Sequence, residues 1–204
     1  MTVGMKDRIL DTTDRLFYRQ GIRAVGVDTI AADAGISKRT LYNHFPSKDA
    51  LIVAYLSRRF QPISASEAPP AEQILAVFED LERRFASRGF RGCPFVNAVA
   101  ELGEPTHAAR GVAVAFKEHR RLWFREMLTR LGTEDPDSVA TQLSLLVDGA
   151  IAAALVRGDP TVARAAREAA RTLLVAAGVR IHSSAETPVK RKASRRRRSR
   201  TKRS

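Results

Sequence analysis

Residues 37–48 read SKRTLYNHFPSK and concentrate side chains that bind charged or polar partners. The segment holds three basic residues, two aromatic rings, one histidine, two serines and one threonine. Basic and hydroxyl groups suit phosphate oxygens, whereas amide and guanidinium groups also suit the edges of bases. A surface loop and a catalytic or metal site are the alternatives, and the rest of the chain has to decide among them.

The other residues with reactive side chains do not form an enzyme-like pattern. The histidines, at positions 44, 107, 119 and 182, lack Cys or acidic partners at metal-ligand spacing. Neither a nucleophile–base–acid spacing nor a phosphate-binding loop is present. We therefore expect no enzyme, no metal site and no cofactor. The single cysteine, Cys93, suits a reducing cytosol; we interpret it as a small buried hydrophobe, with an oxidation sensor as the alternative.

The elements around residues 37–48 form a helix-turn-helix pattern. Residues 6–20 carry apolar side chains at helical spacing, and Gly21 follows as a stop. A second helix begins at Val27 and needs a small residue where the helices approach, which Ala31 supplies. Gly35 lies at the reversal, a position that favours positive φ. The apolar Ile36 then fills the turn.

Ser37 is a good N-cap for the next helix, which Pro46 ends. Ser47 caps a following helix through DALIVAYLSRRF. Leu41 and Phe45 are four residues apart and point inward. The remaining side chains of this helix lie on or near its outer face: Lys38, Arg39, Thr40, Tyr42, Asn43 and His44. A helical hairpin with a solvated basic face is the alternative to a DNA-reading helix.

The distribution of charge favours DNA. Residues 1–60 hold 10 Lys and Arg against 6 Asp and Glu, residues 61–182 hold 15 against 15, and residues 183–204 hold 10 against 1. Both ends of the chain are therefore basic while the middle is neutral, which indicates a polyanionic partner at the ends.

The fold class that these patterns predict is all-α. Residues 1–60 form the helix-turn-helix domain, residues 61–182 form a second helical domain, and residues 183–204 form a disordered basic tail. Further helices are expected from about residue 71, in RGCPFVNAVAEL, and over 107–131, 137–157 and 161–177. We find no apolar run near the ~20 residues that cross a bilayer and no signal peptide, and expect no membrane partner.

The segment GIRAVGVDTIAADAGISKRTLYNHFPSKDALI resembles the N-terminal domain of the tetracycline-repressor (TetR) family of bacterial transcription regulators. The similarity covers about residues 6–56, and RGCPFVNAVAEL is similar to a segment in one branch of that family. One departure is Gly26, which stands where the family usually has a Ser or Thr cap. The resemblance implies a DNA-binding set of Ser37, Lys38, Arg39, Thr40, Tyr42, Asn43, His44 and Lys48.

Within this set, Lys38, Arg39 and Asn43 are expected to face base edges, although either Lys38 or Arg39 is equally suited to a phosphate. Thr40, Tyr42, His44 and Lys48 are expected at the DNA backbone. For His44, packing beside Phe45 is an equal alternative.

The resemblance also implies a homodimer through the last two helices, 137–157 and 161–177, whose small and apolar faces suit close approach. Their burial inside one chain is the alternative. It further implies a mostly apolar effector cavity. For each residue alone, a place in the core is the stronger interpretation, but as a set the candidates are Phe78, Phe95, Asn97, Phe116, His119, Trp123, Met127 and Asp148.

The predicted function is a cytoplasmic, nucleoid-associated dimeric regulator that binds a double-stranded DNA operator. A small molecule is expected to release this repressor from DNA. The alternative is an architectural DNA-binding protein dominated by its basic tail, which either clamps DNA or only increases solubility.

Overall fold

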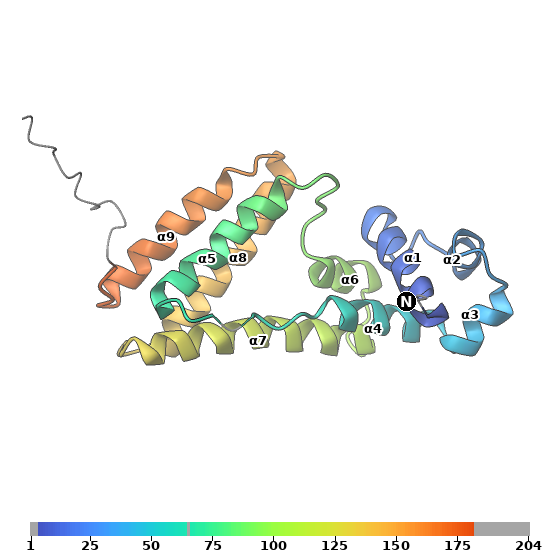
Figure 1. Cartoon of the computed structure of the whole chain (residues 1–204), viewed down its shortest axis with the longest axis horizontal. Helices are drawn as coiled ribbons and strands as arrows, with labels where there is room; N and C mark the ends of the chain where they lie inside the picture. The colour runs from blue at the N-terminus through green and yellow to red at the C-terminus, as the bar shows by residue number, and fades with distance from the viewer. Residues whose placement is uncertain (1–3, 65, 182–204) are drawn as a thin grey trace, which may run out of the picture.

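The computed structural model describes residues 4–64 and 66–181 (Figure 1). The predicted tail, 183–204, lies outside the described residues. Within them the chain forms nine helices and no strand, so the all-α prediction is confirmed. The helices are α1 (Met5–Gln20), α2 (Val27–Asp33), α3 (Lys38–His44), α4 (Lys48–Arg59), α5 (Pro70–Phe85), α6 (Pro94–Leu102), α7 (Ala108–Arg130), α8 (Pro136–Arg157) and α9 (Val162–Ala176).

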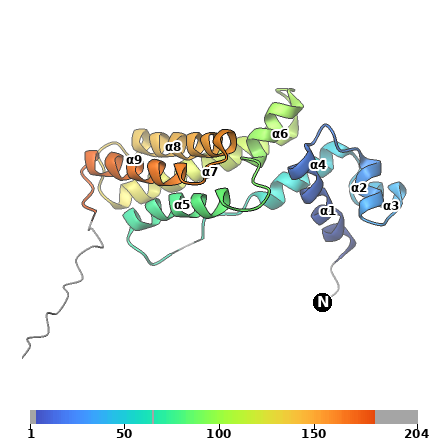
Figure 2. The same ribbon diagram turned by 90° about the horizontal axis from the view of Figure 1, so that it is seen from above.

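Helices α1 to α3 and the start of α4 gather at one end of the molecule (Figures 1 and 2). Apolar side chains from all four helices are buried together there, and the Phe17 and Tyr55 rings meet edge to face at 5.6 Å. Burial raises the pKa of Tyr55 above its ordinary value. This small core fixes the orientation of α3 relative to α1, α2 and α4.

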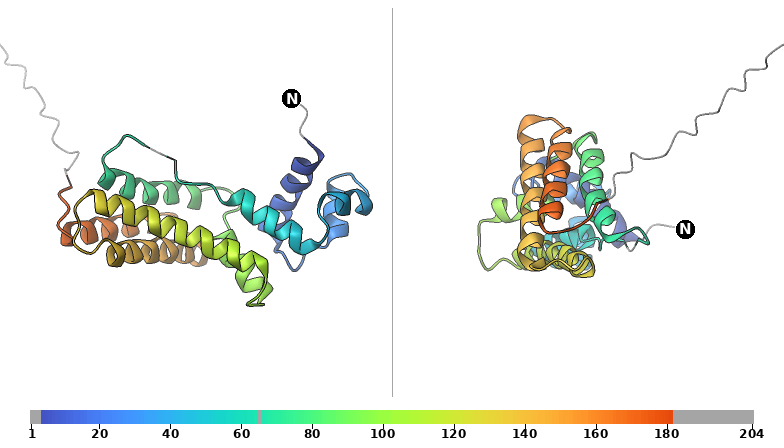
Figure 3. Two further views of the ribbon diagram at one scale, coloured as in Figure 1. Left: turned by 90° about the horizontal axis from the view of Figure 1, so that it is seen from below. Right: turned by 90° about the vertical axis from the view of Figure 1, so that its left-hand side faces the viewer.

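Helices α5, α8 and α9 lie side by side and cross the distal half of the long helix α7 (Figures 1 and 3). Helix α7 also packs against α4 and α6, so it runs from the N-terminal helices to the far end of the molecule. Phe124 and Leu128 of α7 are fully buried, as are Leu143 of α8 and Leu174 of α9. Helix α7 is therefore the main connection between the two groups of helices.

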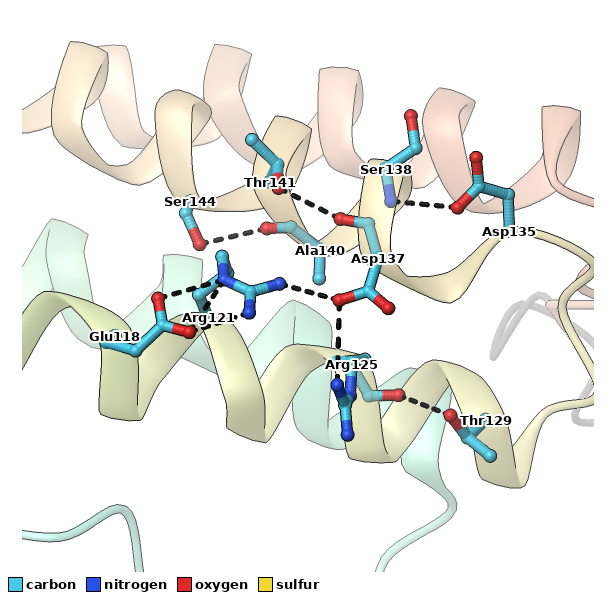
Figure 4. A network of polar contacts seen from close by, with 10 residues as sticks. All are labelled: Glu118, Arg121, Arg125, Thr129, Asp135, Asp137, Ser138, Ala140, Thr141 and Ser144. Carbon is cyan, nitrogen blue, oxygen red and sulfur yellow. Dashed lines mark hydrogen bonds and ion pairs between the residues drawn. The ribbon is translucent and has the colours of Figure 1, made fainter.

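A row of ion pairs joins α7 to α8 (Figure 4). Arg121 donates to Glu118 on its own helix and, at 2.7 Å, to Asp137 on α8, and Arg125 lies 3.8 Å from the same carboxylate. The Arg121 hydrogen bonds hold the pKa values of Glu118 and Asp137 below their ordinary range. The Asp135 side chain accepts from the Ser138 amide and caps α8. These contacts fix the register between α7 and α8.

Helix α8 corrects one expectation. With a mean hydropathy of 1.8 over 18 residues, α8 is long and apolar enough to cross a membrane by length and composition alone. Its Asp148 binds Lys117 and Arg120 of α7, and its buried face packs against α7 and α9. These contacts place one face of α8 in the core of this fold. Only 33% of its 18-residue apolar segment is buried, however, so much of α8 faces outward.

Candidate DNA-binding surface and effector cavity

The turn between α2 and α3 has the expected geometry, and a side chain of α1 stabilises it. Gly35 has a φ of +62°, and Ala31 is buried where the helices approach. Arg8 of α1 donates through Nε to the Ala34 carbonyl at 2.9 Å and through Nη2 to the Gly35 carbonyl at 3.3 Å. Arg8 thus satisfies backbone acceptors that the end of α2 leaves free. The sequence analysis overlooked this contact because it joins residues far apart in the chain.

Side-chain caps and two buried anchors position α3. Ser37 Oγ accepts from the Thr40 amide at 3.0 Å, and Ser47 Oγ accepts from the Ala50 amide at the same distance. Leu41 is fully buried and Phe45 is 4% exposed. Both ends of α3 are therefore fixed, and only one face of the helix is left for a partner.

That outward face carries most of the predicted DNA-binding residues. The side chains of Ser37, Lys38, Arg39, Tyr42, Asn43 and His44 are exposed, and Tyr42 is 39% exposed. Thr40 is half-buried, and its hydroxyl lies 2.9 Å from Ser37 Oγ. His44 is exposed to solvent.

Two of the predicted DNA-contacting lysines have intramolecular neighbours. Lys38 lies 2.9 Å from Asp28 of α2, and this hydrogen bond raises the lysine pKa. Lys48 is half-buried, with Nζ 5.9 Å from the centre of the Phe17 ring, and burial lowers its pKa. Lys38 must therefore leave its ion pair with Asp28 before it can contact DNA. Lys48, which is held near Phe17, has less freedom to reach a phosphate.

A cavity of about 820 Å³ lies in the C-terminal part, among α5, α7, α8, α9 and the start of α6. Four of the predicted effector residues line it, namely Phe95, Phe116, His119 and Trp123. Phe95 and Phe116 stack with ring centres 3.9 Å apart, and Phe60 meets Phe116 and His119 edge to face. One wall is therefore aromatic.

The other four predicted effector residues do not line this cavity. Phe78 and Met127 are buried in the helical core, at 1% and 3% exposure. Asn97 donates to the Arg91 carbonyl at 2.7 Å and thereby holds the loop before α6. Asp148 is occupied by Lys117 and Arg120. Helical spacing alone did not separate core positions from the cavity wall.

Arginines on the cavity wall were missed by the sequence analysis: Arg59, Arg84, Arg120, Arg167 and Arg171. Arg59 ends α4 and donates to Asp14 of α1 at 2.8 Å, with its guanidinium 4.3 Å from the Tyr18 ring centre. Burial disfavours the cation, yet the hydrogen bond to Asp14 keeps the pKa of Arg59 raised. Arg59 therefore links the cavity to the N-terminal core.

Three further contacts join the two groups of helices. Glu101 of α6 accepts from the Arg23 amide at 3.0 Å, and Tyr18 of α1 donates to the Gly92 carbonyl at 3.0 Å. His107 caps α7 by accepting from the Ala109 amide, while its other ring nitrogen lies 3.4 Å from Asp49 at the start of α4. Side chains therefore connect α6 and α7 directly to the N-terminal helices α1 and α4.

The fold and the α3 surface define a helix-turn-helix DNA-binding protein with a second, helical domain. Residues 9–55 match the family described as "Bacterial regulatory proteins, tetR family", and residues 70–169 match "Transcriptional regulator LmrA/YxaF-like, C-terminal domain". The chain belongs to the TetR family of bacterial transcriptional regulators, which confirms the resemblance.

Solved structures and relatives agree with this assignment. A TetR-family regulator from Streptomyces coelicolor is 33% identical, with a TM-score of 0.76 over 85% of this chain and 95% of that one. The transcriptional repressor KstR of Rhodococcus jostii is 32% identical over 68% of this chain and 67% of its own length. The regulator LmrA of Bacillus subtilis is 25% identical over 76% of this chain and 89% of its own length.

Proposed function

We propose that this chain is a dimeric repressor that binds an operator through α3 and leaves it when a small molecule fills the cavity. The observation that carries the proposal is the outward face of α3, where Arg39 and Asn43 stand exposed on a helix fixed by caps and buried anchors. A major groove admits one such helix, and guanidinium and amide groups suit base edges. Cytoplasmic location follows from access to the chromosome.

The outer faces of α8 and α9 support the proposed dimer. Leu145, Gly149, Ala152 and Val156 recur along one exposed side of α8, and Val156 is 85% exposed. Helix α9 lies beside α8 and adds Val175, which is 57% exposed. Small residues allow close helix approach, and a second copy would cover this apolar area. Two copies would also present two reading helices to two half-sites.

The cavity supports release by a ligand. Its wall includes Arg59 at the end of α4, and α7, which carries Phe116, also contacts the start of α4 through His107. A ligand that favours one position of α7 would therefore change the position of α4 and, in a dimer, the spacing of the two α3 helices. This shift in population lowers operator affinity without any new contact at the DNA.

Substitutions on α3 test the DNA-binding part of this proposal. We expect Arg39→Ala and Asn43→Ala each to weaken binding to an operator selected from random DNA about 5- to 150-fold, because a base contact is worth roughly 1–3 kcal/mol. Binding to unrelated DNA should change little. Fluorescence anisotropy at physiological salt measures both affinities.

The matched control is Arg83→Ala, which removes an exposed arginine of α5 that pairs with Asp80 on the same helix. This variant should bind the operator as the parent does. Equal losses on operator and unrelated DNA for Arg39→Ala and Asn43→Ala would show that α3 does not read sequence and would sink the proposal.

An architectural role is the second candidate, favoured by the 10 Lys and Arg within residues 183–204. Helix α9, which precedes this segment in the chain, lies at the end of the molecule away from α3 (Figures 1 and 2). If the tail clamps DNA, a chain that ends at His182 will show a shallower dependence of log K on log salt. An unchanged slope would leave the tail without a role in DNA binding.

A further inference from the structure

The chemistry of the cavity wall points to the class of effector, an inference that rests on the proposed function. Its apolar part includes the stacked rings of Phe95 and Phe116 together with Trp123 and Ile151. Such a wall suits an aromatic or long aliphatic body. The polar part of the wall decides what charge that body carries.

A cluster of two cations and one anion stands at this wall. Lys117 Nζ and Arg120 Nη2 both approach the same carboxylate oxygen of Asp148, at 2.5 and 2.6 Å. Two cations therefore share one carboxylate, and the cluster keeps one positive charge. Arg120 is nine-tenths buried and lines the cavity, so this charge is only weakly screened by solvent.

Two buried arginine donors and one buried histidine nitrogen near the cavity lack hydrogen-bond partners within residues 4–64 and 66–181. Arg120 Nε, Arg167 Nε and His119 Nε2 are buried without a hydrogen-bond partner among the residues that the structure describes. All three residues line the cavity. A buried donor without an acceptor is unfavourable, and the Nε of arginine is always protonated. Residues of the wall therefore carry positive charge and arginine donors that no acceptor in the described part of the chain satisfies.

The acidic residues of the lining do not cancel this preference. Glu72, Glu79 and Asp80 are exposed positions of α5. Glu79 forms an ion pair with Arg167 at 3.0 Å, and Asp80 is paired with Arg83 on its own helix. These carboxylates lie in solvent, where their interactions are screened, whereas Arg120 is buried.

We propose that the effector is an amphipathic monoanion, an apolar or aromatic body that ends in a carboxylate. The carboxylate accepts from the guanidinium of Arg120, beside His119, and the body lies against Phe95, Phe116 and Trp123. A charge-assisted hydrogen bond inside an apolar cavity is strong and selects the ionised group over its uncharged isostere.

Matched pairs of probes test this assignment on the full chain. The set is naphthalene-2-acetate and decanoate, each compared with its own primary amide by isothermal titration calorimetry. We expect at least one carboxylate to bind about tenfold or more tightly than its amide. The same carboxylate should weaken operator binding in anisotropy measurements.

Two substitutions are expected to move the carboxylate-to-amide ratio in opposite directions. Arg120→Gln removes the donor and leaves Lys117 and Asp148 as a neutral pair, so the ratio should fall to about one. Asp148→Asn leaves both cations without their carboxylate, so the ratio should rise. Arg110→Gln, which removes an exposed arginine of α7 that does not line the cavity, is the control and should leave the ratio unchanged. Circular dichroism checks folding, and if Arg120→Gln does not fold, Asp148→Asn decides.

The assignment is wrong if neither carboxylate binds or if the amides bind equally well. It is also wrong if the carboxylate-to-amide ratio is the same in the folded Arg120→Gln and Asp148→Asn variants as in the parent. The same samples without probe report operator affinity. A parent protein that prefers its operator but shows no carboxylate preference contradicts only the ligand class. A parent without operator preference contradicts the proposed function itself.

Discussion

Gly35 meets two separate structural requirements at the turn that orients α3. Its φ of +62° lies in the left-handed region, which side chains with a Cβ rarely adopt. A Cβ at this residue would also lie 3.0 Å from Nη2 of Arg8, the group that holds the turn. Gly26, at the start of α2, is different: its φ is −82° and a Cβ there meets nothing within 4 Å.

We therefore expect Gly35→Ala to lower the free energy of unfolding by about 1–2 kcal/mol, the usual cost of a left-handed non-glycine residue. Gly26→Ala, the matched control, should cost less, about 0.5–1 kcal/mol, because Gly26 is the N-cap of α2 and alanine caps a helix less well than glycine. Urea unfolding followed by circular dichroism measures both. Equal effects for the two variants would contradict the role assigned to Gly35 in the turn.

At the scale of elements, ion pairs join α7, which contacts α4, to α8, the helix proposed for dimerisation (Figure 4). This α7–α8 seam consists of Glu118, Arg121, Arg125 and Asp137. Because the seam lowers the pKa of Asp137, the ionised carboxylate favours the folded state. The contribution is complete above the ordinary pKa of an aspartate and disappears as the pH falls through the lowered folded-state value. Stability should therefore depend on this residue near neutral pH and not in acid.

For Asp137→Asn we predict a melting temperature a few degrees below the parent at pH 7, with a difference that shrinks as the pH falls below about 4. Glu126→Gln, which removes an exposed acid of α7 outside the seam, serves as control. Thermal unfolding between pH 3 and 7 provides the measurement. A constant difference across this range would mean that the ion pairs do not stabilise the folded state.

The helices were predictable because their signals are local. Ser37, Ser47 and Pro46 mark helix ends within a few residues, and Leu41 and Phe45 lie one turn apart, so α3 and its outward face followed from spacing. The contacts of Arg8, Arg59 and His107 were not predictable, because each joins segments far apart in the chain. Only four of the eight predicted effector residues line the cavity. Helical periodicity identifies the inward face of a helix, but it does not show whether that face packs against another helix or borders a cavity.

At the scale of the molecule, α3 lies at one end, and α8 and α9, which carry exposed apolar side chains, lie in the other domain (Figure 2). Helix α7 runs between the two regions and forms part of the cavity wall. A dimer formed through α8 and α9 would therefore fix the distance between two α3 helices. A ligand in the cavity would act on the helix that sets this distance.

We expect Val156→Glu on α8 to convert the dimer into a monomer, because it places a charge within the apolar contact. Val114→Glu introduces the same charge at an exposed position of α7, where Val114 is 60% exposed, and should leave the dimer intact. Analytical ultracentrifugation gives the mass, and circular dichroism verifies folding. A dimer that survives Val156→Glu would place the interface elsewhere.

The most direct test of the central claim is genome-wide mapping of the DNA bound by the parent chain and by its Arg39→Ala variant. A dimeric regulator that reads sequence through α3 predicts a small number of bound sites that share an inverted repeat and are lost in the variant. Occupancy spread along the chromosome without a shared sequence, and unchanged in the variant, would contradict the account.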